Sequence, residues 1–129
     1  MDRIIEFRGK DAHGIWRYGS LVTDNKYNDV EPAIYFPVKT GSVIQMDWVY
    51  VDIKTVGQYT GLCDVDGNKI YEGDIVYVGS VFKDMIVVWY NDRLMFKHTK
   101  DDTNNAYYNM DYINRIAKLK IVGNIYTEN

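Results

Sequence analysis

Four of the ten glycines lie within residues 55–76, and this spacing constrains the fold more than any other feature of the sequence. The four are Gly57, Gly61, Gly67 and Gly73, and residues suited to β-strands separate them. Because glycine adopts positive φ and allows close backbone approach at little steric cost, such spacing usually fixes the path of the chain. The stretch predicts short strands joined by turns, with a tight turn at Asp66-Gly67. Within it, residues 56–62 suit either a short strand or an irregular loop.

The composition of the whole chain also favours a sheet. Hydrophobic residues make up 47% of the 129 residues and aromatic residues 15%, including 12 tyrosines. Such a chain is too apolar to be disordered, and its tyrosine, valine and isoleucine side chains fit a pleated, half-buried surface. Its length is that of one ordinary domain.

Apolar or alternating runs predict the positions of the strands. They lie at residues 3–8, 15–22, 33–36, 43–51, 75–78, 85–90, 93–98 and 118–126. Pro32 and Pro37 bracket the third run, so we expect an edge strand there. Polar residues at 23–31 and 100–105 predict exposed loops. Residues 106–116 have apolar and tyrosine side chains at roughly helical spacing, which suits a short helix, although a strand is equally compatible with the tyrosines.

These elements predict a mainly β fold with little helix. We expect an N-terminal antiparallel sheet over residues 1–54, packed on a C-terminal SH3-like small β-barrel within residues 55–129. The barrel would begin near Ile70 and close with residues 118–126. The soft boundary near residue 55 also allows the two parts to form one compact domain.

Charge and cysteine content restrict the class of protein. The net charge is −3 and no segment is strongly basic, so a general coat for DNA or RNA is not expected. The single cysteine, Cys63, cannot form an internal disulfide, which fits a reducing compartment. The first eight residues carry charges where a signal peptide needs an apolar run, and no window suits a membrane span. We therefore expect a soluble, cytoplasmic protein without membrane contact, and a Cys63 side chain that is buried.

One acidic segment resembles part of a calcium-binding loop. Residues 64–68 read Asp-Val-Asp-Gly-Asn. If Gly67 occupied the sixth loop position, the first and twelfth would be Leu62 and Gly73, where carboxylate ligands are required. We therefore favour a hairpin turn with solvated aspartates, and we expect no metal and no other cofactor.

Glu72 and Asp74 flank a glycine and would share one face of a strand, as paired carboxylates for acid–base chemistry do. A turn with two solvated acids is the commoner arrangement. His13 and His98 are the two histidines and both lie in polar, loop-like contexts. We predict no catalytic residue. An enzyme would need one of the histidines within hydrogen-bond reach of a carboxylate in a cleft.

The candidate binding residues lie in the glycine-spaced stretch: Gln58, Tyr59, Thr60, Tyr71, Glu72 and Asp74. Gln58 to Thr60 stand between two glycines and could present backbone amides and a hydroxyl to a ligand. We favour an architectural role, in which Tyr59 inserts its ring between two sheets. The aromatic residues of the strands could likewise form a stacking platform, but core or interface packing is the commoner role.

Three motifs in order carry a family resemblance. Residues 56–62 read Val-Gly-Gln-Tyr-Thr-Gly-Leu, residues 70–76 read Ile-Tyr-Glu-Gly-Asp-Ile-Val, and residues 121–126 read Ile-Val-Gly-Asn-Ile-Tyr. Together with Asp66-Gly67, Phe7-Arg8 and the Gly-Ile-Trp-Arg-Tyr-Gly of residues 14–19, they resemble the YopX family of small proteins encoded mainly by bacteriophages and prophages. The resemblance implies a phage or prophage origin and a host bacterial cytoplasm. It supplies no catalytic residues.

We therefore expect a non-enzymatic phage or prophage accessory protein that acts through protein–protein contacts. Its partner would be an unknown phage or host protein, with homo-oligomerisation through exposed strand edges as one form. One alternative is a small β-barrel that binds nucleic acid, which requires four cations to converge beside Tyr77 or Trp89. These cations are Arg93, Lys97, Lys118 and Lys120. The other alternative is a small enzyme that uses Glu72 and Asp74.

Overall fold

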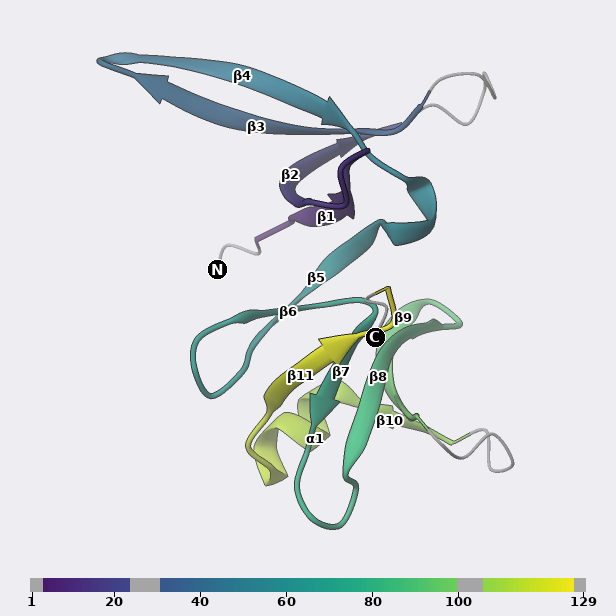
Figure 1. The fold of residues 1–129 in the computed structure, drawn as a ribbon. Helices are drawn as coiled ribbons and strands as arrows, with labels where there is room; N and C mark the ends of the chain where they lie inside the picture. Colours follow the sequence, from purple (N-terminus) through teal and green to yellow (C-terminus); the bar gives the residue numbers. More distant parts are fainter. Residues whose placement is uncertain (1–3, 24–30, 100–105, 127–129) are drawn as a thin grey trace. The chain divides into compact units, whose positions relative to one another are not determined.

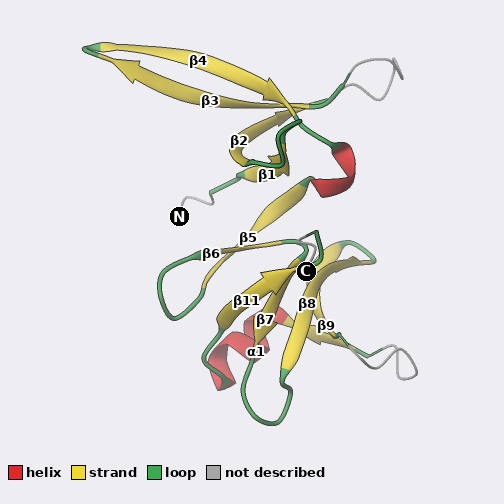
Figure 2. Cartoon of the chain, viewed as in Figure 1, coloured by secondary structure: helices red, strands yellow, loops and turns green. Residues whose placement is uncertain are grey.

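The computed structural model describes residues 4–23, 31–99 and 106–126 (Figure 1). The loops predicted at 23–31 and 100–105 lie almost entirely outside these ranges. Strands dominate the described residues, together with one short α-helix and one 3₁₀ turn, so the mainly β class is confirmed (Figure 2). The chain divides into two compact units, residues 1–59 and 60–129, and the division falls within strand β5.

The first unit is an antiparallel sheet. Its strands are β1 (Phe7–Lys10), β2 (Trp16–Val22), β3 (Ala33–Thr40), β4 (Val43–Tyr50) and the start of β5 (Gly57–Cys63), with the 3₁₀ turn η1 (Ile53–Thr55) before β5. The sheet order is β4-β3-β2-β1-β5. The first two predicted strands pair as an antiparallel hairpin, but β1 begins four residues later than we expected and runs on to Lys10. The buried guanidinium of Arg8 lies 4.3 Å from the ring centroid of Trp16, so the two side chains stack on this hairpin.

Strand β3 differs from the prediction of a short edge strand. It pairs with β2 at residues 33–35 and with β4 along its whole length, so it runs through Pro37 to Thr40. The backbone N–H of Val51 donates to the carbonyl of Pro32, so odd-numbered residues at this end of β4 point their backbone polar groups at β3. By alternation, the backbone nitrogen of Pro37, which has no hydrogen to donate, points away from β4, at a level where β2 no longer pairs with β3. The proline therefore costs the ladder no hydrogen bond.

Gly19 marks the point where β2 changes its partner. Strand β2 pairs with β1 up to Gly19 and with β3 from Ser20 onward. A Cβ atom at Gly19 would lie 2.1 Å from the backbone carbonyl oxygen of Tyr35. Only glycine allows β3 to pass this close, because the obstacle is backbone and cannot rotate away.

The second unit holds a separate sheet. Its strands are β7 (Asp74–Tyr77), β8 (Asp84–Tyr90), β9 (Arg93–His98), β10 (Tyr107–Asn109) and β11 (Lys120–Asn124), in the order β10-β9-β8-β7-β11. The end of β5 pairs with β6 (Lys69–Tyr71). The sheet is open, with β10 and β11 at its edges. The SH3-like barrel is therefore not confirmed, and the described strands do not close into a barrel.

The core of the second unit lies on one face of this sheet. It is formed by side chains from the strands and from helix α1 (Met110–Ile116): Ile70, Val76, Val78, Met85, Val87, Phe96, Met110, Ile113 and Leu119. The predicted element at 106–116 is therefore a strand followed by a helix. Asn109 separates them, because its side chain accepts the N–H of Tyr112 as an N-cap. No helix among the described residues is long and apolar enough to cross a membrane.

We predict that Gly19→Ala destabilises the first unit by about 3 kcal/mol, because the backbone of β3 must move to admit the methyl group. Gly41→Ala is the matched control. Gly41 has φ +62°, but a Cβ there meets nothing within 4 Å, so its cost should be about 1–2 kcal/mol. Urea unfolding of both variants measures the difference. Equal losses would contradict the close-approach explanation.

Candidate functional site

The first three candidate residues lie at the division between the units. Gln58 is half-buried and lies opposite Phe7 in the sheet. Tyr59 is buried, and its backbone N–H donates to the carbonyl of Glu6. The hydroxyl of Thr60 donates to the carbonyl of Ile70 at 2.8 Å. The structure thus places all three in strand β5, and a ligand-binding role for them stays a prediction.

The other three candidates form the turn between β6 and β7. Asp74 is 2% exposed, and its carboxylate accepts the N–H of Tyr71 at 2.8 Å. Glu72 accepts the indole N–H of Trp89 at 3.1 Å. Gly73 has φ +91°, and its N–H donates to the carbonyl of Val87. The expectation of two solvated acids is therefore wrong for Asp74, which is buried because it closes the turn.

The histidines differ in environment. His13 is exposed on the loop between β1 and β2. His98 ends strand β9, with its ring 6.4 Å from Phe82 and 5.5 Å from Tyr108 between centroids. It lines a shallow hollow of about 720 Å³ with residues of the β7–β8 loop, including Lys83, and with Asp84 and Thr99. Glu72 and Asp74 do not line this hollow, so His98 and the two candidate acids are not brought together there; the carboxylate that shares the hollow with His98 is that of Asp84.

The segment that resembles a calcium loop is closed by Asp64. This side chain is buried, and its carboxylate accepts the backbone N–H groups of Asp66, Asn68 and Ile121 at 3.0, 2.9 and 3.2 Å. We expected solvated aspartates, and Asp64 is the exception because these donors replace water. Burial raises the pKa of Asp64, but the N–H donors outweigh it and the pKa lies below its ordinary value. Within the described ranges, no three His, Cys, Asp or Glu side chains gather in a way that could hold a metal.

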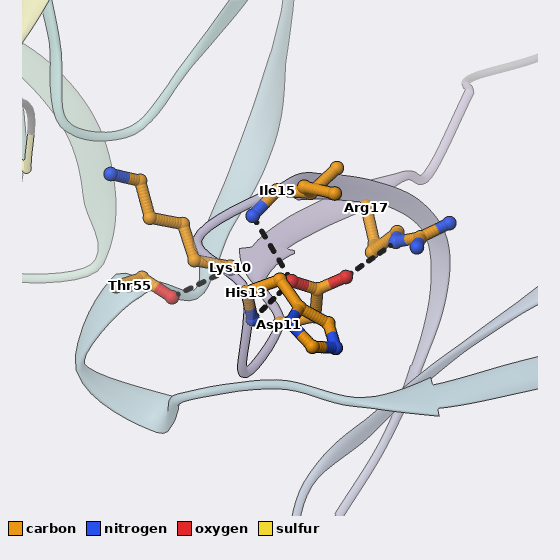
Figure 3. A network of polar contacts seen from close by, with 6 residues as sticks. All are labelled: Lys10, Asp11, His13, Ile15, Arg17 and Thr55. Carbon is orange, nitrogen blue, oxygen red and sulfur yellow. Dashed lines mark hydrogen bonds and ion pairs between the residues drawn. The ribbon is translucent and has the colours of Figure 1, made fainter.

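The loop between β1 and β2 repeats this geometry around Asp11 (Figure 3). The carboxylate of Asp11 accepts the N–H groups of His13 at 2.9 Å and Ile15 at 3.0 Å, and the Nε–H of Arg17 at 2.9 Å. The N–H of Ile15 is the strongest influence that lowers the pKa of Asp11, and Arg17 adds to it against the effect of burial. In both loops the glycine three residues after the buried aspartate, Gly14 after Asp11 and Gly67 after Asp64, has positive φ.

We missed this shared Asp-x-x-Gly pattern from the sequence. In both loops the aspartate N–H donates to the carbonyl four residues later, and the glycine N–H donates to the aspartate carbonyl. Each is a three-residue hairpin loop that ends in a left-handed glycine, rather than the two-residue turn predicted at Asp66-Gly67. The two occurrences at residues 11–14 and 64–67 could have revealed the motif. Cys63, which we expected to be buried, is exposed beside it.

Among the described residues, six exposed large hydrophobic side chains lie on strands β3 and β4: Val38, Val43, Ile44, Met46, Trp48 and Tyr50. These two strands form a ribbon (Figure 1). By register, six apolar side chains larger than alanine share one face of this ribbon: Tyr35, Pro37, Ile44, Met46, Trp48 and Tyr50. We call this set the ribbon face. Ile44 is 67% exposed, Met46 59%, Trp48 45% and Tyr50 52%. Trp48 contacts both tyrosines, with ring centroids 6.2 Å from Tyr35 and 4.8 Å from Tyr50.

Alternation along the predicted strand at residues 43–51 places the four β4 members of this set on one side. It did not add Tyr35 and Pro37, because only the register of β3 against β4 brings them onto the same face. It also gave no reason to expect exposure, since an apolar strand face is normally buried.

The cations of the nucleic-acid alternative converge only in part. By register, Arg93 and Lys97 of β9 and Lys120 of β11 lie on the same sheet face as Tyr77. Trp89 lies on the opposite face. Arg93 forms an ion pair with Asp92, and Lys120 forms one with Asp66. Lys118 precedes β11 and belongs to no strand.

We predict that Asp64→Asn destabilises the second unit at neutral pH by about 2 kcal/mol, because buried N–H donors lose a charged acceptor. The lowered pKa means that the carboxylate stabilises the fold above its unfolded pKa of about 3.9 and that this stability is lost as pH falls through the folded value. The difference between wild type and variant should therefore shrink below about pH 4. Urea unfolding as a function of pH measures it. Asp66→Asn, at an exposed position, is the control and should cost less than about 1 kcal/mol.

Comparisons with known proteins bear on the fold and the family of this chain. Among solved structures, the chain is similar to the crystal structure of protein EF1440 from Enterococcus faecalis, with a TM-score of 0.56 and 18% sequence identity over 97% of this chain and 95% of that one. That likeness concerns the fold alone. No curated protein matches the sequence. The family model described as YopX protein matches residues 6–129, nearly the whole chain, and the protein therefore belongs to the YopX family.

Proposed function

We propose that the protein is a non-enzymatic phage or prophage accessory protein that acts in the host bacterial cytoplasm through protein–protein contacts, and that the ribbon face is its contact surface. Membership of the YopX family supports the origin and the compartment. The observation that carries the contact surface is the exposure of Ile44, Met46, Trp48 and Tyr50 on one face of a two-stranded ribbon.

The composition of the ribbon matches that of an interface. The cores of protein interfaces are rich in tryptophan, tyrosine and methionine and poor in charge. Strands β3 and β4 hold two charged residues, Lys39 and Asp47, in a chain with 26% charged residues. Asp47 lies opposite Phe36, on the other face. Trp48 and its two tyrosine neighbours are the residue types that most often dominate binding energy.

Among the described residues, the outer half of the ribbon also has no third strand paired with it that would stabilise it. From Phe36 to Met46 the two strands pair with each other, and β2 pairs with β3 only at residues 33–35. An isolated two-stranded ribbon is marginally stable in water. Exposed apolar side chains on such an element are costly unless a partner covers them.

A non-enzymatic role is supported by the partners of the acidic residues. Asp74 and Asp64 accept backbone N–H groups, and Glu72 accepts the indole N–H of Trp89. These bonds give each carboxylate a structural use. His98 lies near the rings of Phe82 and Tyr108 and lines a hollow that Glu72 does not line.

We expect a photo-crosslinking amino acid at Met46 to capture a protein in the bacterial host, because that side chain points from the ribbon face. The same amino acid at Gln45, on the opposite face of the same ribbon, is the matched control and should capture much less. Western blotting against a tag on the chain measures the crosslinked species. Equal crosslinking at both positions, or none at Met46, would argue against the ribbon face as the contact surface.

The nucleic-acid alternative has a separate test. With a net charge of −3 and ion pairs on Arg93 and Lys120, the purified chain should not shift single-stranded or duplex DNA or RNA at low salt. An electrophoretic shift that weakens with added salt and with Lys97→Glu would instead favour nucleic-acid binding through the sheet of the second unit.

A further inference from the structure

We propose that the ribbon face is covered by the same face of a second copy of this chain, with the two ribbons antiparallel about a two-fold axis. This inference rests on the proposed function, since it names the partner of that contact surface. A two-fold contact requires a surface that is complementary to itself. The charges and the exposed area of the ribbon meet this requirement.

Charge is distributed unevenly along the ribbon face. Lys39 lies at the tip, opposite Ile44 in the register. At the base, the N–H of Val51 donates to the carbonyl of Pro32, so the ladder continues beyond β3 and β4. Alternation from Ala33 then places Glu31 on the ribbon face, and alternation from Tyr50 does the same for Asp52. The face therefore has a basic tip, an apolar middle and an acidic base.

This order favours one orientation of two copies. When the ribbons lie antiparallel, Lys39 of each copy meets Glu31 and Asp52 of the other, and the apolar middles meet each other. A parallel arrangement would place Lys39 against Lys39 and the acidic residues against each other. Like charges in contact are unfavourable, so the charges favour the antiparallel arrangement of the two ribbons.

The area is sufficient for a weak dimer. From the exposed fractions of Ile44, Met46, Trp48 and Tyr50, and roughly 200 Å² for a full large side chain, these residues present about 400 Å² on each copy. Tyr35, Pro37 and the charged ends add to this. Two copies together reach about 1,000 Å², the lower limit for a specific interface. We expect a dissociation constant on the order of micromolar.

The face, rather than the free edge of β4, forms the contact. Even-numbered residues of β4 point their backbone polar groups away from β3, toward the free edge. The backbone N–H of Trp48 is one of these groups, and it already donates to the carboxylate of Asp47 at 2.8 Å. A strand that paired with this edge would have to break that bond at the middle of β4. Charged groups at a strand edge commonly block such pairing.

Analytical ultracentrifugation of the full chain across a range of concentrations tests the proposal. We expect a monomer–dimer equilibrium that Met46→Glu abolishes and that Gln45→Glu, on the opposite face, leaves unchanged. Lys39→Glu and Glu31→Lys should each weaken dimerisation by about 3- to 10-fold, because each reverses one charge of two symmetric pairs. The double variant should recover part of this loss, since the charges at positions 39 and 31 again oppose each other while Asp52 then faces a like charge. Urea midpoints of all variants show that they remain folded.

A folded chain that stays monomeric up to millimolar concentration would overturn the dimer. A dimer that is insensitive to Met46→Glu, or not rescued by the double charge variant, would overturn the antiparallel ribbon arrangement. If the chain is monomeric while the crosslinker at Met46 still captures another protein in the host, the second copy is the wrong occupant and the proposed function stands. If Met46 captures nothing as well, both fail.

Discussion

The carboxylate of Asp64 is the interaction on which the second unit depends. It accepts N–H groups from its own loop and from Ile121 of the final strand, and so it joins segments that are 57 residues apart in sequence. The neighbouring N–H of Val65 donates to the carbonyl of Leu119, which adds a second link to the same place. A buried carboxylate is favourable only when N–H donors replace water, and this loop provides them. The edge strand β11 is held by a polar contact as well as by its ladder with β7.

The same physical device appears at Asp11, where the loop between the first two strands is closed by a buried carboxylate. Asp74 closes a third turn in the same manner. The acidic residues that first suggest chemistry therefore stabilise turns, because a carboxylate is a strong acceptor for the N–H groups that tight turns leave unpaired. What remains outside this internal pairing is the ribbon face, whose apolar side chains are exposed to water. The contrast between paired acids and uncovered aromatics is the reason for placing function on the ribbon.

Much of the fold was predictable. Strand β9 occupies the predicted residues 93–98, and β8 begins one residue before the predicted 85–90, because alternating apolar residues report a half-buried strand directly. Strand β3 was predicted too short because Pro37 normally ends or borders a strand, and only the register shows that its absent donor faces no neighbour. The closed barrel was also not confirmed. Strand periodicity cannot show whether the last strand meets the first, since closure depends on pairing between residues that are distant in sequence.

The sequence by itself determined the class of the fold, the positions of most strands, the turns at the spaced glycines and the family resemblance. These depend on local preferences, namely alternation, φ and composition, which a short segment carries within itself. The tertiary structure alone decided which acids are buried, where strand β2 changes its partner at Gly19, and that Tyr35 and Pro37 join the residues of β4 on one exposed face. Burial and register arise from pairing between separate strands, so no single segment contains that information.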